Sequence, residues 1–285
     1  MSTSGTAVRS YLYVPGNAPS RMDKARASAA DAVIVDLEDA VPWTQKAAAR
    51  VTTRRWLDQQ VPSRQELWVR VSPGAAREFD LQALAGVSGV TGIVLAKAES
   101  VEDVRSTHAD LQRLGLRDLT ISPLLETAAA LLDCRAIAQT AGVAHLQIGE
   151  YDLCADTGIS PDESETELAQ LRAMVVLASA AANIASPPAP VSTEIRDSER
   201  FAASTQRAAR QGFFGRACIH PAQLPVVHAI FTPSGEEIHA AKSVLGDLER
   251  AVAAGVGVLI DENGRLLDEA VVRRARHVVA AADTT

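Results

Sequence analysis

Two carboxylates stand where neighbouring strands are expected to end. Glu126 follows the apolar run 120–125, and Asp152 comes shortly after the run 145–148. Two carboxylates brought together at such ends repel each other unless a hard divalent cation lies between them. The pair therefore predicts a Mg²⁺ site with several open coordination positions. The same spacing is also compatible with a plainer role, in which each carboxylate caps the helix that follows it.

Arg70 ends a short apolar run, and its guanidinium has the forked donor geometry that grips a carboxylate. We expect it either to bind the acid group of a substrate or to form a buried ion pair with Asp36 or Glu38. Strand alternation places these two acids on one face, and Asp39 begins the loop that follows. Glu38 is the member best placed to point into the mouth of a site. Three acids so close together are equally suited to cap the next helix.

Other polar residues carry weaker signals. Lys24 and Lys97 are cations near the same rim, where either could meet a phosphate or simply be solvated. His220 ends the last expected strand, and it suits either catalysis or a hydrogen bond to a backbone carbonyl. No GxSxG elbow, P-loop or GxGxxG stretch is present, so Ser/His/Asp hydrolysis and dinucleotide binding lack their usual signatures. The histidines show no zinc-binding spacing.

Short β-branched runs alternate along the chain with longer Ala-rich segments that carry charges at helical spacing. This alternation is typical of a parallel sheet wrapped by helices and predicts an α/β fold, a (β/α)₈ (TIM) barrel with its reactive groups at the carboxyl ends of the strands. The expected strands are 10–14, 32–37, 67–71, 92–96, 120–125, 145–148, 190–195 and 217–220. The expected helices are 19–30, 45–59, 79–85, 101–114, 128–141, 163–184, 198–211 and 221–230.

The last fifty or so residues exceed what such a barrel needs. They predict a helix at 236–254, a strand at 256–260 that enters a turn, and a final helix at 269–282. We therefore divide the chain into a catalytic barrel, residues 1–232, and a C-terminal lid and oligomerisation segment, residues 233–285. This helical extension would cap the barrel, pack on a second subunit, or do both.

Composition limits the class of protein. The chain has 285 residues, 28 Lys plus Arg against 35 Asp plus Glu, and a net charge of -7. An acidic balance without a basic run argues against nucleic acid as the ligand. No apolar stretch is long enough to span a bilayer, so we expect no membrane partner and a cytoplasmic location. The three cysteines are far apart and predict neither a disulfide framework nor a CxxC metal site.

The ordered motifs of the chain resemble those of the HpcH/HpaI aldolase/citrate lyase family, on the branch of citrate lyase β-subunits and free-standing CoA-ester lyases. The resemblance spans almost the whole chain in collinear order. It is carried by RSYLYVPG at 9–16, ADAVIVDLEDAV at 30–41 with Lys46 and Arg50 after it, VRV at 69–71, GIVLAKAES at 92–100, PLLETA at 123–128, GEYDL at 149–153 and IHPAQ at 219–223.

The resemblance implies a (β/α)₈ barrel that assembles into homotrimers or homohexamers and binds Mg²⁺ through Glu126 and Asp152. It implies that Arg70 binds the oxo-acid part or the acyl oxygen of the substrate. Glu38 matches an acidic residue at the pocket. Lys24 falls on a lysine that contacts CoA.

Two further site residues follow from the same resemblance. Many relatives have Arg where Ala18 stands here, and Arg21, one helical turn away, is expected to replace it on the CoA side. The stretch GRLLD at 264–268 resembles a lid motif whose aspartate reaches into the neighbouring subunit's site, so Asp268 is the candidate acid/base. Relatives also commonly carry Asn at the position of Ser72 and Pro at that of Ala96.

The reaction implied is the Mg²⁺-dependent cleavage of a hydroxyacyl-CoA thioester, such as malyl-CoA or citramalyl-CoA, into acyl-CoA and a 2-oxo acid or glyoxylate. The reverse condensation would use the same site. Four alternatives stay open: a citryl lyase β-subunit that works within a complex, a malyl-CoA thioesterase, an aldolase of free 4-hydroxy-2-oxo acids, and a non-catalytic regulatory binder of acyl-CoA. The acyl chain, its stereochemistry and the choice between trimer and hexamer are left undetermined.

Overall fold

The computed structural model describes residues 8–253 and 268–282. The chain divides into two compact units: one is Val8–His228, and the other combines Met1–Ala7 with Ala229–Thr285. Among the described residues, no helix combines the length and apolar character needed to cross a membrane.

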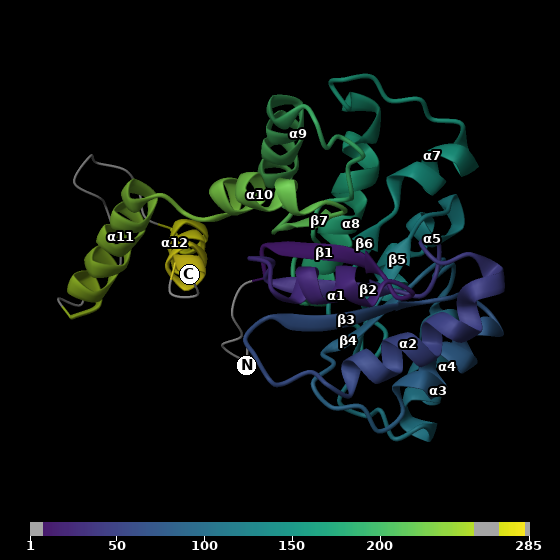
Figure 1. Cartoon of the computed structure of the whole chain (residues 1–285). Coiled ribbons are helices and arrows are strands. Elements are labelled where there is room, and N and C mark those ends of the chain that lie inside the picture. Colours follow the sequence, from purple (N-terminus) through teal and green to yellow (C-terminus); the bar gives the residue numbers. More distant parts are fainter. Residues whose placement is uncertain (1–7, 254–267, 283–285) are drawn as a thin grey trace. The chain divides into compact units, whose positions relative to one another are not determined.

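The first unit is built on a parallel sheet whose order is β6-β5-β4-β3-β2-β1-β7 (Figure 1). Its central strands are almost wholly buried, which suits their runs of β-branched residues. The strands are β1 (Ser10–Pro15), β2 (Ala32–Asp36), β3 (Glu66–Val71), β4 (Gly92–Leu95), β5 (Thr120–Leu125), β6 (Gln147–Ile148) and β7 (Arg216–Cys218).

The seventh of the eight predicted strands, 190–195, is not a strand, so the described residues form a seven-stranded parallel sheet and not a complete (β/α)₈ barrel. Only an isolated parallel bridge between Ala189 and Arg216 marks its place beside β7. The physical reason is the sequence PPAP at 187–190, because prolines lack the N–H group that a strand ladder requires.

Helices follow the strands and lie around the sheet (Figure 1). They are α1 (Pro19–Arg26), α2 (Lys46–Leu57), α3 (Ala76–Leu84), α4 (Val101–Arg113), α5 (Ala128–Leu132), α6 (Cys134–Ala138), α7 (Glu150–Thr157), α8 (Ala169–Ala182), α9 (Ser198–Arg210) and α10 (Leu224–Phe231). The predicted helix 128–141 is thus divided at Asp133, and α7 was not predicted. Glu150 in the first turn of α7 forms a buried ion pair with Arg172 of α8, 2.5 Å from its Nε, which ties this short helix to the fold.

The interior of the sheet changes from apolar to charged along the strands. Tyr11, Ile34, Trp68 and Leu124 belong to one buried cluster. Ile34 pairs with Trp68 in the β2–β3 register, and two residues further on Asp36 pairs with Arg70. Because side chains two residues apart share a face of a strand, the charged pair lies directly above the apolar cluster, at the carboxyl ends of the strands.

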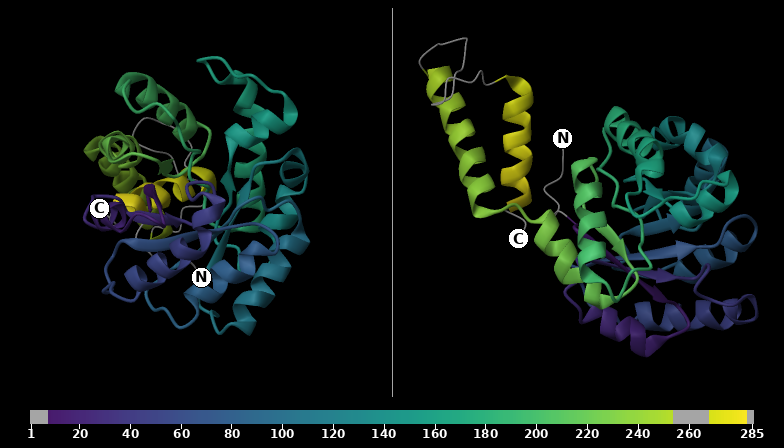
Figure 2. Two further views of the ribbon diagram at one scale, coloured as in Figure 1. Left: turned by 45° about the vertical axis from the view of Figure 1, so that its right-hand side comes forward. Right: turned by 90° about the horizontal axis from the view of Figure 1, so that it is seen from above.

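The second unit contains a helical hairpin in its described part. Helices α11 (Gly235–Ala253) and α12 (Glu269–Ala282) run side by side, as the right-hand view of Figure 2 shows. They confirm the two helices expected near the C-terminus. The strand expected at 256–260 lies outside the described residues.

Candidate functional site

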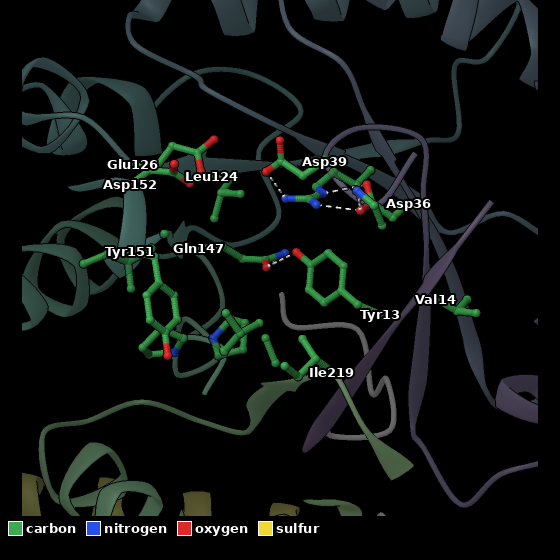
Figure 3. Close-up of a pocket in the computed structure, with 18 of the residues that line it drawn as sticks. Tyr13, Val14, Asp36, Asp39, Leu124, Glu126, Gln147, Tyr151, Asp152 and Ile219 are labelled. Atoms are coloured by element: carbon green, nitrogen blue, oxygen red, sulfur yellow. Dashed lines mark hydrogen bonds and ion pairs between the residues drawn. The ribbon is translucent and has the colours of Figure 1, made fainter. Parts of the chain in front are cut away.

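A cavity of about 510 Å³ opens at the carboxyl ends of the strands in the first unit (Figure 3). It brings together four of the residues expected to form the site. Its charged lining residues are Arg21, Asp36, Asp39, Arg70, Glu126 and Asp152. Most of the others are apolar or aromatic, among them Tyr13, Leu124, Ile148, Tyr151 and Ile219.

Glu126 and Asp152 lie beside each other on one side of the cavity (Figure 3). Glu126 follows β5 directly and is only 2% exposed, whereas Asp152 stands in the first turn of α7 and is exposed. Burial raises the pKa of Glu126 well above its usual range; the Lys97 amide opposes the shift, and the neighbouring Asp152 carboxyl adds to it. This is the electrostatic cost that a bound cation would relieve.

The donor set of this pair suits Mg²⁺. Mg²⁺ binds oxygen ligands and commonly takes one or two carboxylates while keeping several water molecules. Among the residues that the structure describes, no group of three or more His, Cys, Asp or Glu side chains is arranged to hold a metal.

Arg70 forms the buried ion pair that was one of the two roles considered for it. Its Nε and Nη2 donate to the two carboxylate oxygens of Asp36 at 2.7 and 2.6 Å, and its Nη1 lies 3.3 Å from Glu38. The guanidinium also stacks 5.2 Å from the centre of the Tyr13 ring and still lines the cavity. Asp36 additionally accepts the backbone N–H groups of Glu38 and Ala40. Asp36 thus orients Arg70, and the remaining nitrogen of the guanidinium, Nη1, also lies 3.6 Å from Asp39 of the cavity wall.

Glu38 does not line this cavity, contrary to the expectation that it points into the mouth. It is 5% exposed, and it accepts from Lys97 Nζ at 3.1 Å and from the Asp39 backbone N–H at 2.8 Å. Asp39 occupies the cavity wall instead. None of these acids caps the following helical turn, which begins after Pro42 without a side-chain cap.

Arg21 and Lys24 lie on α1 at a second hollow of about 400 Å³. Arg21 lines both hollows, so the two adjoin, and Lys24 lines the second alone. His220 also lines the second hollow. Its Nδ1 accepts the backbone N–H of Ala222 at 3.1 Å, where we expected a bond to a carbonyl. In the neutral ring this leaves the proton on Nε2.

Sequence reasoning missed a polar chain that crosses the sheet interior beneath the charged groups. The Tyr13 hydroxyl donates to Gln147 Oε1 at 3.0 Å, and Gln147 Nε2 donates to Ser122 Oγ at 3.0 Å (Figure 3 shows the first bond). Burial raises the pKa of the Tyr13 phenol above its usual range, so the hydroxyl keeps its proton. The sequence contained a sign of this chain of hydrogen bonds, because Gln147 is a polar residue in the otherwise apolar, buried strand β6.

Asp268 lies in the other unit. Its carboxylate accepts the backbone N–H of Val271 at 2.9 Å and so caps the start of α12. The remainder of the expected lid motif, 264–267, lies outside the described residues. The assignment of Asp268 as an acid/base therefore stays a prediction.

Comparisons with known proteins find relatives that cover almost the whole chain. The chain is 32% identical to a citrate lyase subunit beta-like protein of Deinococcus radiodurans, covering 98% of this chain and 99% of the relative. It is 31% identical to a (3S)-malyl-CoA thioesterase of Cereibacter sphaeroides, covering 96% and 94%. The crystal structure of CitE from Mycobacterium tuberculosis in complex with magnesium, acetoacetate and coenzyme A has a TM-score of 0.77 and 31% identity, covering 97% of this chain and 98% of that one.

A family model extends the agreement along most of the first unit. The model of the HpcH/HpaI aldolase/citrate lyase family matches residues 9–221, a range that includes the carboxylate pair and the arginine opposite it. The chain belongs to the HpcH/HpaI aldolase/citrate lyase family.

Proposed function

We propose that this chain is a Mg²⁺-dependent carbon–carbon lyase that cleaves a hydroxyacyl-CoA thioester of the malyl-CoA or citramalyl-CoA kind into acyl-CoA and a 2-oxo acid or glyoxylate. One observation carries the proposal: a single cavity at the strand ends is lined by Glu126, Asp152 and Arg70. The relatives named citrate lyase subunit beta-like, and the CitE complex with magnesium and coenzyme A, support it.

Glu126 and Asp152 would hold the Mg²⁺. When bound there, the ion would supply Lewis acidity to the oxygen that becomes a carbonyl as the carbon–carbon bond breaks. The ion requires both carboxylates in their ionised form, and its binding would displace the proton that burial favours on Glu126. The residues of the chain perform the remaining tasks.

Arg70 would bind the acid group of the substrate and stabilise negative charge as it develops. Asp36 holds the guanidinium in place through two hydrogen bonds, so little reorganisation is needed. Arg21 and Lys24, at the adjoining hollow, would meet the phosphates of CoA. The oligomer would be a homotrimer or homohexamer, in which Asp268 of a neighbouring subunit enters the site.

The chemistry requires two proton transfers. The hydroxyl group of the substrate loses its proton as its carbon becomes a carbonyl, and the electron pair of the broken bond passes to the α-carbon of the thioester. That enolate then takes a proton and leaves as acyl-CoA. Asp268 is our candidate for the acid that protonates it.

Thioester hydrolysis is the second candidate, because one relative with 31% identity is a (3S)-malyl-CoA thioesterase. The purified protein should be given malyl-CoA, citramalyl-CoA and free 4-hydroxy-2-oxo acids, each with and without Mg²⁺. A lyase forms a 2-oxo acid or glyoxylate without releasing a free thiol, whereas a thioesterase releases free CoA and a hydroxy acid. Activity on free acids alone, or activity indifferent to Mg²⁺, would refute the proposal.

The subunit arrangement is tested separately. Inactive Asp268→Ala mixed with inactive Glu126→Ala should recover part of the activity if Asp268 acts across subunits, since hybrid oligomers contain some complete sites. No recovery after demonstrated subunit exchange would remove that role. Activity that appears only with an acyl-carrier partner would identify the chain as a subunit of a larger lyase.

A further inference from the structure

Lys97 lies two residues beyond the end of β4 and has an uncommon backbone conformation. Its φ angle is +49°, in the left-handed region that few residues other than glycine adopt. Among the described residues other than glycine, Glu165 and Asn183 share this feature. Glu165 stands directly before the 3₁₀ turn Thr166–Leu168, and Asn183 stands at the C-terminal end of α8, where left-handed residues are common. Lys97 stands at no helix end. Such strained residues persist only where their surroundings enforce the conformation.

Two acids hold Lys97 from opposite ends. Its backbone N–H donates to Glu126 Oε1 at 2.7 Å, and its Nζ donates to Glu38 Oε1 at 3.1 Å. Both acids are almost fully buried, at 2% and 5% exposure, so neither can readily exchange this partner for water. The lysine backbone is therefore anchored through its own side chain while its amide is directed at the candidate metal ligand.

The arrangement distinguishes the two oxygens of Glu126. The Lys97 amide occupies Oε1. The other oxygen, Oε2, lies against Gly149, where an added Cβ atom would be only 2.8 Å away. The carboxylate is thus held between a hydrogen-bond donor on one side and the bare backbone of a glycine on the other. Because Oε1 already accepts a hydrogen bond, Oε2 is the oxygen that we expect would help Asp152 to hold a cation.

We infer that Lys97 is a positioning residue: its backbone amide holds Glu126 with Oε2 directed at the cation, and its ammonium, anchored on Glu38, maintains the backbone conformation that this requires. The inference rests on the proposed function, because it presupposes Mg²⁺ at Glu126 and Asp152. Lys97 does not line the cavity and is not a catalytic residue.

Electrostatics and positioning predict opposite effects for Lys97→Met. Removing a positive charge close to a cation site should tighten Mg²⁺ binding if charge alone matters. If Lys97 positions Glu126, the loss of its anchor should weaken Mg²⁺ binding, by about tenfold or more, the range found when residues behind metal ligands are changed. The sign of the change in affinity therefore separates the two explanations.

The experiment is calorimetric titration of Mg²⁺ into the full-length protein without substrate, with circular dichroism to verify folding. We expect Lys97→Met to weaken binding about tenfold or more, Lys97→Arg to restore most of the affinity, and Lys242→Met, at an exposed lysine of α11, to bind as wild type. Lys97→Gly is the second variant, because glycine adopts the left-handed conformation without strain. It too should bind Mg²⁺ weakly, since it lacks the anchor.

Each outcome decides the matter. If folded Lys97→Met binds Mg²⁺ as tightly as wild type or more tightly, the inference is overturned. It is also overturned if Lys242→Met weakens Mg²⁺ binding equally. If Lys97→Met does not fold, wild-type Mg²⁺ affinity in Lys97→Gly overturns the inference. Asp152→Asn separates this failure from that of the proposed function. If wild type does not bind Mg²⁺, or Asp152→Asn binds it equally well, the metal site itself is refuted and the inference with it. If Asp152→Asn loses binding and Lys97→Met keeps it, only the role of Lys97 fails.

Discussion

Gly149→Ala tests how closely the fold confines the carboxylate of Glu126. Gly149 precedes α7 with a φ of -99°, which alanine adopts without strain, so any effect of the substitution must be steric. The added Cβ would lie 2.7 Å from Glu126 Cβ and 2.8 Å from its Oε2. Carbon atoms in contact prefer about 3.5–4.0 Å, so the overlap is about 0.8 Å or more.

The overlap cannot be relieved by rotating a flexible side-chain end, because Glu126 Cβ is attached directly to the backbone. Either β5 or the start of α7 must move. Overpacking of this kind costs about 1–3 kcal/mol, which for a unit of this size lowers the Tm by roughly 2–12 °C. The same movement displaces Oε2, so Mg²⁺ affinity should fall by about tenfold or more.

Thermal unfolding and Mg²⁺ titration measure the two effects. Gly235→Ala is the matched control, because a Cβ at Gly235 meets no atom within 4 Å. We expect this control to keep the wild-type Tm, or to raise it slightly, and to bind Mg²⁺ normally. If Gly149→Ala also retains both the wild-type Tm and the wild-type affinity, the confinement of Glu126 described above is incorrect.

Three further predictions concern the charged groups. Asp152→Asn should abolish Mg²⁺-dependent turnover and leave the circular dichroism spectrum intact, because Asp152 is exposed; undiminished turnover would contradict the metal assignment. Arg70→Leu should lower the free energy of unfolding in urea by about 3–5 kcal/mol, because it leaves the buried Asp36 without its counter-charge; an unchanged midpoint would show that the pair contributes little. The raised pKa of Glu126 means that the folded metal-free protein binds the proton more tightly than the unfolded chain. The Tm of the metal-free protein should therefore fall as pH rises from about 5 to 9. The fall should be less steep for the protein with Mg²⁺ and for Glu126→Gln. Equal slopes of Tm against pH in the metal-free protein, the protein with Mg²⁺ and Glu126→Gln would refute this.

The sequence predicted most of the strands and the positions of the site residues at their ends. Parallel strands that are buried on both faces have apolar sequences. Polar residues at the ends of such apolar runs are therefore easy to identify in the sequence, as Arg70 and Glu126 are. Family membership, inferred from the ordered motifs, is confirmed by the family model and by the relatives. The expected strand at 190–195 was wrong, because the prolines at 187, 188 and 190 lack the N–H groups that a strand ladder requires.

The local sequence could not predict contacts between distant segments. The helix that carries Asp152 is short and acidic, and its tie to the fold is an ion pair with an arginine 22 residues away. The bond between Tyr13 and Gln147 joins residues 134 positions apart. Glu38 is likewise turned from the cavity by Lys97, which lies 59 positions further along the chain.

The sequence by itself determined the class of fold, the family and the types of side chain at the strand ends, because hydrophobic periodicity and ordered motifs are local properties of the chain. Only the tertiary structure decided which of those side chains share the cavity, which oxygen of Glu126 is hydrogen-bonded, and that Asp36 orients Arg70. These outcomes depend on distances and burial between segments far apart in sequence, and it is folding that establishes such distances and burial.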